Sequence, residues 1–141
     1  MAGQFQLHPQ LAADTALLGD WPLSRLLLMN DDGWPWVILV PRRTDIRELH
    51  ELASQDLARL TAETARVSAA LDALYQPTKV NVGMLGNRVA QLHMHVVARY
   101  ESDEAWPGPV WGMRPRRAYP AAMLAHRVSE LQQQLGVAPA E

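Results

Sequence analysis

The chain has 141 residues, the size of one ordinary domain and enough to bury a hydrophobic core. Its composition is 48% hydrophobic and 20% charged with a formal net charge of -2, which is typical of a soluble globular protein and argues against a non-specific nucleic-acid binder. The sequence has no cysteine, so disulfides and thiolate chemistry are excluded. We expect a single domain over residues 1–141, with no sequence-specific nucleic-acid partner.

Residues 1–9 have neither a basic start nor an apolar core, so they do not read as a signal peptide. The longest apolar runs, residues 26–29 and 36–40, are far too short to cross a bilayer. These two features predict a cytoplasmic protein with no membrane partner.

Short strands separated by turns are predicted before residue 42. Residues 14–18 and 24–29 are apolar runs bounded by turn residues, and residues 36–40 have the pattern of a buried strand that ends at Pro41. Asn30-Asp31-Asp32-Gly33 has the composition of a turn. Its carboxylates and amide are also suited to accept hydrogen bonds from vicinal hydroxyl groups.

Helices are predicted in the middle and at the end of the chain. Thr44 is suited to cap a single helical turn over residues 44–49. A long packing helix follows over residues 54–75, where Glu63 falls off an apolar stripe made of Leu57, Leu60, Thr64, Val67, Leu71 and Leu74. A last helix begins after Pro120 and stops at Gly136.

The stretch Gln91–Val96 alternates polar and apolar residues, which predicts a strand with Gln91, His93 and His95 on one face. The apolar face should lie in the core, so the histidines should face solvent or a cleft that a ligand can reach. A turn at Gly86-Asn87 makes this strand the second arm of a hairpin. Histidines at alternate positions can also lie on a solvated face and have no function. The pattern alone therefore does not distinguish a ligand site from a solvated surface.

Two further segments are ambiguous. Residues 105–112 are too rich in Pro and Gly for regular structure, yet they carry Trp106 and Trp111, which should be covered. The segment can pack on its own domain or on a partner, and we favour the partner. The basic run Arg114-Pro115-Arg116-Arg117 is a solvated loop or a phosphate contact.

Residues 81–99 resemble the signature of the histidine triad (HIT) superfamily of nucleotide hydrolases and transferases, His-φ-His-φ-His-φ-φ with φ apolar, with Gln91 in place of the first His. Residues 30–42 are similar to the family's polar residue, Pro-containing turn and apolar strand ending in Pro. The resemblance implies a HIT-like α+β fold, with an antiparallel sheet of about five strands, one long packing helix and a C-terminal helix. It also implies a homodimer that needs no cofactor.

The resemblance implies a role for each residue of the site. His93 is the nucleophile that attacks the α-phosphate and forms a nucleotidyl-histidine. His95 stabilises charge on the phosphate or the leaving group, and the backbone carbonyl of Gln91 orients His93 while its amide donates to phosphate. Substrate contacts are expected from Asn30 at the ribose and, beside the phosphate, from Asn81, Asn87 and Arg88.

Two functions are open at this point. The first is an enzyme acting on a nucleoside phosphoramidate, a nucleotidyl ester or a dinucleoside polyphosphate. The second is a nucleotide-binding module with little turnover, because the triad is incomplete. A third and weaker alternative is a zinc site made of His93, His95 and a carboxylate, but no nearby Asp or Glu has a suitable spacing, so no metal is expected.

Overall fold

A computed structural model describes residues 4–138. Residues 1–3 and 139–141 lie outside the described range, so the first part of the segment that does not read as a signal peptide is not covered. The sheet consists of β1 (Thr15–Asp20), β2 (Ser24–Met29), β3 (Trp36–Pro41), β4 (Lys79–Gly83) and β5 (Met94–Arg99). The helices are α1 (Pro9–Asp14), α2 (Ser54–Tyr75), α3 (Ala121–Leu135) and the short 3-10 helix η1 (Leu49–Glu51). The predicted α+β fold class is confirmed.

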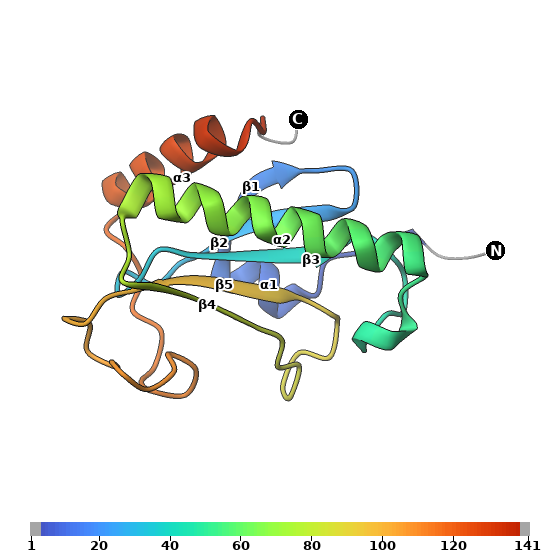
Figure 1. The fold of residues 1–141 in the computed structure, drawn as a ribbon, viewed down its shortest axis with the longest axis horizontal. Helices are drawn as coiled ribbons and strands as arrows, with labels where there is room; N and C mark the ends of the chain where they lie inside the picture. The colour runs from blue at the N-terminus through green and yellow to red at the C-terminus, as the bar shows by residue number, and fades with distance from the viewer. Residues whose placement is uncertain (1–3, 139–141) are drawn as a thin grey trace.

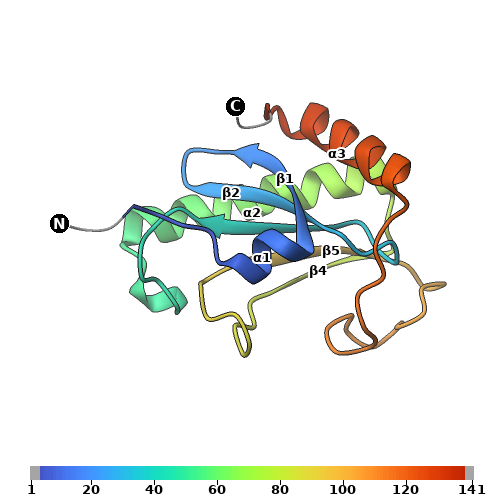
Figure 2. The same ribbon diagram turned by 180° about the vertical axis from the view of Figure 1, so that it is seen from behind.

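The five strands pair antiparallel throughout, in the order β1-β2-β3-β5-β4. Figure 1 shows α2 lying across one face of the sheet with α3 beside it, and Figure 2 shows α1 on the opposite face. Buried side chains fill both faces, so the sheet separates two hydrophobic clusters. Within the part of the chain that the structure describes, no helix is long and apolar enough to span a membrane.

Helix α2 has the predicted bounds, and Leu60, Val67 and Leu71 on its stripe are fully buried against the sheet. Glu63, expected off the stripe, is instead only 3% exposed. Its carboxylate accepts hydrogen bonds from the backbone N–H groups of Leu23 (3.1 Å) and Ser24 (3.0 Å). The apolar stripe predicts only which apolar residues are buried. Glu63 is buried for another reason, because buried backbone N–H groups need a hydrogen-bond acceptor.

One local prediction was wrong, and one short helix was not predicted. Residues 44–49 do not form a helical turn, because Asp45 adopts a left-handed conformation (φ 57°) that interrupts any helix there. A 3-10 turn follows at η1, where Glu48 and Glu51 form a capping box. Helix α1 was not predicted, and its N-cap is His8, whose Nδ1 accepts the backbone N–H of Gln10 at 3.0 Å.

The Pro- and Gly-rich segment over residues 105–112 packs against its own domain. Val110 is 4% exposed within the hydrophobic cluster on the α1 face of the sheet, and Trp111 packs against that cluster. The basic run beyond it pairs with the connection between β2 and β3: Arg114 binds Asp31 at 2.9 Å, and Arg117 binds Asp32 at 2.6 Å. These pairs fasten the segment to the end of the sheet where β5 finishes.

Candidate functional site

The histidine pair lies where the loop over residues 84–93 enters β5. The strand begins at Met94 and not at Gln91, so the expected hairpin of β4 and β5 has a longer connection than the sequence pattern predicted. Leu92 and Val96 are buried in the cluster beneath α2, as the alternation predicted. His95 consequently lies on the opposite face, paired across the sheet with Ile38 of β3.

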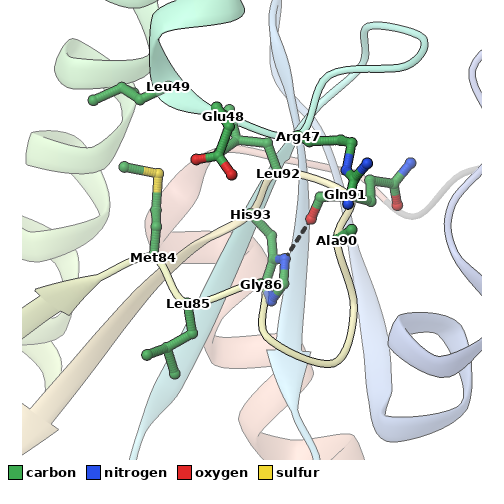
Figure 3. A pocket seen from close by; sticks show the side chains of 10 residues that line it. All are labelled: Arg47, Glu48, Leu49, Met84, Leu85, Gly86, Ala90, Gln91, Leu92 and His93. Atoms are coloured by element: carbon green, nitrogen blue, oxygen red, sulfur yellow. Dashed lines mark hydrogen bonds between the residues drawn. The ribbon is translucent and has the colours of Figure 1, made fainter.

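His93 is held by a backbone contact. Its Nδ1 lies 2.6 Å from the carbonyl oxygen of Gln91 (Figure 3). Because a carbonyl can only accept, Nδ1 carries the proton and Nε2 keeps its lone pair. Burial is the largest influence on the pKa of His93 and lowers it, with a smaller lowering from nearby His8, while the hydrogen bond to Gln91 opposes this.

A cleft with a volume of about 180 Å³ borders His93. Its other walls come from the loop before β5 and from the β3–α2 connection, and its lining residues are Arg47, Glu48, Leu49, Met84, Leu85, Gly86, Ala90, Gln91, Leu92 and His93 (Figure 3). Typical small-molecule sites have about 300–1,000 Å³. The cleft is smaller than that range, and it is large enough for a phosphate-sized group.

His95 is enclosed by aromatic rings. The indole Nε1 of Trp36 donates to His95 Nδ1 at 3.0 Å, and the ring centroid of Trp111 lies 5.5 Å from that of His95. Its own centroid is 4.8 Å from that of His93, and both histidines are 6% exposed. Burial, with a contribution from His93, lowers the pKa of His95 to about 3. His95 is thus a neutral ring at physiological pH.

Strand β4 brings Asn81 and Gly83 to the same face, since Gly83 pairs with His95 and Asn81 with Val97. A Cβ atom on Gly83 would lie 3.2 Å from the Trp111 ring, so the absence of a side chain there allows the indole to approach the strand. Asn81 Oδ1 accepts a hydrogen bond from buried Arg99 at 2.7 Å. Asn81 is therefore held in place on the face of the sheet that carries His95.

The side chain of Gln91 is engaged with the N-terminal segment. Its Oε1 accepts the backbone N–H of His8 at 2.9 Å, and its Nε2 donates to the carbonyl of Gln6 at 2.9 Å. The amide expected to donate to phosphate thus already has two backbone partners. The backbone carbonyl of Gln91 is the part of the residue that contacts His93.

The other expected substrate contacts are more dispersed. Asn30 follows β2, which runs parallel to β5, so it lies at the opposite end of the sheet from His93. Its Oδ1 accepts the backbone N–H of Tyr119 at 2.9 Å. Asn87 and Arg88 are exposed on the loop before β5, and Arg88 forms no ion pair with any residue from 4 to 138.

Several residues near the histidines were not identified as site residues from the sequence. Trp36 was placed correctly in a buried strand, but a strand that is apolar on both faces gives no sign of which face each residue takes. Trp111 was recognised only as an aromatic that needs cover. Arg47 was not singled out; it is exposed, and it lines the cleft beside His93.

The zinc alternative depends on a third ligand near the two imidazoles. Over residues 4–138, no three His, Asp or Glu side chains gather in an arrangement that could hold a metal ion. The Nδ1 atoms of His93 and His95 both have hydrogen-bond partners within the protein.

Known proteins are similar to this chain in both sequence and fold. The HIT domain family matches residues 10–102. A histidine triad protein from Marinobacter aquaeolei is 48% identical with a TM-score of 0.92, covering 95% of this chain and 98% of its own. A histidine triad protein from Bradyrhizobium japonicum is 41% identical with a TM-score of 0.91, and the match covers 94% of this chain and 99% of its own. One from Sinorhizobium meliloti is 43% identical with a TM-score of 0.89, and the match covers 92% of this chain and 96% of its own. No protein with curated annotation matches significantly.

Proposed function

This chain belongs to the HIT domain family of nucleotide-binding proteins and hydrolases, and from that premise we propose that it is a nucleotidyl hydrolase or transferase acting at an α-phosphate. Its substrate is a nucleotide conjugate: a phosphoramidate, a nucleotidyl ester or a dinucleoside polyphosphate. The single observation that carries the proposal is the 2.6 Å contact of His93 Nδ1 with the Gln91 carbonyl, which leaves the Nε2 lone pair free on a ring that borders a cleft.

In the first step, His93 Nε2 attacks the α-phosphorus. A P–N bond forms, the bond from phosphorus to the leaving group breaks, and the leaving group departs with the bonding electrons. The imidazole becomes cationic while it carries the nucleotidyl group, and the Gln91 carbonyl, which accepts the Nδ1 proton, stabilises that charge. The lowered pKa of His93 keeps the free ring neutral, which is the nucleophilic form.

In the second step, water or another acceptor attacks the same phosphorus. The P–N bond breaks, its electrons return to His93 Nε2, and the proton of the attacking hydroxyl is released. His95 stabilises charge on the phosphate oxygens or on the leaving group in both steps. This sequence of steps requires no metal ion or other cofactor.

We assign the substrate contacts on the same premise. Asn81 lies on the face of the sheet that carries His95, and exposed Arg88 has a guanidinium suited to a bidentate phosphate contact. Asn87 is next to it in the same loop. Asn30 is assigned to the ribose, and this is the weakest assignment, because its Oδ1 already accepts a hydrogen bond from Tyr119 and it lies at the far end of the sheet.

A nucleotide-binding module with little turnover is the second candidate. Two observations favour it: both imidazoles are only 6% exposed, and the amide of Gln91 is engaged by the N-terminal segment. The enzyme is the better supported of the two, because the feature of Gln91 that the mechanism needs is its backbone carbonyl, which any residue at this position has. We therefore expect turnover that is slowed rather than abolished by the incomplete triad.

The two candidates are separated by incubating the purified protein with a fluorogenic adenosine phosphoramidate, with and without a chelator. The enzyme predicts turnover that survives chelation and is lost in His93→Ala. Binding of the compound without turnover supports the module, and turnover lost on chelation supports the metal alternative. His126→Ala is the matched control, since the side chain of His126 is 78% exposed on α3.

A covalent intermediate gives the sharpest test. Rapid acid or base quenching, followed by mass spectrometry of the peptides, should find the nucleotidyl group on His93 in the wild type and no adduct in His93→Ala. An adduct on any other residue, or turnover that persists in His93→Ala, would contradict the proposed mechanism.

We also propose that each chain forms one domain over residues 1–141, that two chains form a homodimer, and that the protein acts in the cytoplasm. The dimer is supported by the exposed edge strand β4, where Val82 is 49% exposed, and by nearby Leu85 at 50%. Sedimentation at micromolar concentration tests it, and a monomer there would count against this assembly.

A further inference from the structure

We propose that Trp36 is a positioning residue, which holds His95 in the tautomer with its proton on Nε2 and so makes His95 a hydrogen-bond donor toward the substrate. The part of this inference that concerns catalysis rests on the proposed function. The part that concerns the tautomer does not, and it can be tested on a protein that turns over nothing.

The assignment follows from what an indole can do. A tryptophan Nε1–H donates and cannot accept, so the atom 3.0 Å from it, His95 Nδ1, must be the acceptor. A neutral imidazole has one protonated nitrogen, so the proton of His95 is on Nε2. Trp36 is 5% exposed and His95 6%, so water is largely excluded from the bond.

The sheet register fixes this pair. Ile38 of β3 lies opposite His95 of β5, and Trp36 lies opposite Val97. Trp36 and His95 are therefore diagonal neighbours on one face, a separation that long aromatic side chains bridge. The Trp111 ring lies at 70° to the His95 ring on that face, with centroids 5.5 Å apart, and restricts its rotation. The orientation of Nδ1 toward Trp36 is thus built into the sheet.

The neighbouring ring has the opposite tautomer. His93 Nδ1 faces a carbonyl, which can only accept, so His93 is protonated on Nδ1 and has its lone pair on Nε2. The two centroids are 4.8 Å apart. One imidazole therefore offers a lone pair and the next offers an N–H, which is the combination that attack on phosphorus with stabilisation of its oxygens requires.

Protonation of His95 is disfavoured in the same arrangement. A second proton on Nδ1 would face the Trp36 N–H directly and break the bond. Burial and the adjacent His93 both lower the pKa of His95 and so favour the neutral ring. His95 thus acts by donating a hydrogen bond and not by exchanging a proton with solvent.

The direct test is nitrogen-15 NMR of the histidine rings at neutral pH, with two-bond couplings to the ring carbon protons that identify each nitrogen. We expect His95 to show an unprotonated Nδ1 and a protonated Nε2, and His93 to show the reverse. A protonated Nδ1 on His95 in the wild type would overturn the proposal, whatever the activity of the protein.

Trp36→Phe tests the role of the indole, and Trp21→Phe is the matched control. Trp21 also donates from a buried indole, to the Leu135 carbonyl at 3.2 Å, but from the cluster beneath α2. We expect Trp36→Phe to produce a mixture of His95 tautomers and to lower kcat by about tenfold or more, with a smaller change in KM. Trp21→Phe should change neither, and an unchanged His95 tautomer in Trp36→Phe would contradict the proposal.

A reciprocal variant covers the case in which Trp36→Phe fails to fold. In His95→Phe the indole loses its acceptor, so the Trp36 Nε1–H resonance should shift and exchange faster with solvent, while the Trp21 Nε1–H resonance stays in place. No change at Trp36 would show that the bond is absent in solution.

Discussion

At the scale of single residues, His93 and His95 differ in what each nitrogen faces. Burial lowers the pKa of both rings, so both are neutral when the protein is at neutral pH. A carbonyl orients the first and an indole the second. Two side chains of the same type, two positions apart, are thereby suited to opposite roles.

The pH dependence of turnover follows from His93. The nucleophile must be neutral, so activity is present above the pKa of His93 and is lost as the pH falls through it. Because that pKa lies below its usual value of about 6.5, we expect the acid limb of kcat/KM to lie below that pH. The measurement is the pH profile with an adenosine phosphoramidate. An acid limb at or above pH 6.5 would show that another group controls the rate.

The sequence singled out the two histidines from alternation and from a family resemblance, but it did not predict the contacts of the Gln91 side chain. A strand pattern assumes that the chain is extended, whereas β5 begins only at Met94. Residues before the strand are free to turn, and the Gln91 amide binds the backbone of Gln6 and His8, more than 80 positions away in the chain. A local sequence pattern cannot predict a contact between residues so far apart in the chain.

At the scale of elements, prediction succeeded where a periodic apolar pattern is bounded by clear stop residues. The predicted ranges of β2 and α2 are those observed, and α3 begins after Pro120 and ends before Gly136. Elements that depend on a few hydrogen bonds were missed, including the six-residue α1 that His8 caps. Short helices have no propensity signal strong enough to outweigh their surroundings.

Glu63 gives a prediction at this scale, because one side chain of α2 satisfies two backbone N–H groups at the start of β2. Glu63→Ala leaves both groups buried without an acceptor, so we expect the free energy of unfolding to fall by about 2–4 kcal/mol. Urea denaturation measures it. Asp72→Ala, on the exposed side of the same helix, is the control and should change stability far less. Equal effects of the two variants would mean that the Glu63 contacts contribute little.

At the scale of the whole molecule, the order of elements predicted the fold class, but not the path of residues 105–118. Composition showed that Trp111 needs cover without showing which surface provides it. The answer depends on Gly83, which lets the indole approach β4, and on Arg114 and Arg117, which pair with Asp31 and Asp32. These contacts join segments far apart in the sequence, so a local sequence pattern cannot predict them.

Acid stability tests the burial of the histidines in the intact fold. The pKa of His95 is about 3 in the folded protein and about 6.5 when unfolded, so between these values the unfolded chain binds the extra proton. Stability should therefore fall as the pH drops below about 6.5, by up to about 1.4 kcal/mol per pH unit for this group. Urea titrations from neutral pH to pH 5, above the range of most carboxyl groups, measure the slope.

His95→Gln removes the titrating ring but keeps an acceptor for Trp36, so its slope should be shallower than that of the wild type. His126→Gln, in which the lost ring is exposed, should leave the slope unchanged. A wild-type slope that is flat down to pH 5 would mean that His95 is solvated in the folded state.

The enclosure of His95 between Trp36 and Trp111 has a practical consequence. The chain has five tryptophans, and two of them contact this one imidazole. Any compound that settles against that ring alters the surroundings of both indoles at once. The intrinsic tryptophan fluorescence of the protein should therefore change when a compound binds there, which allows compounds to be screened without a dye.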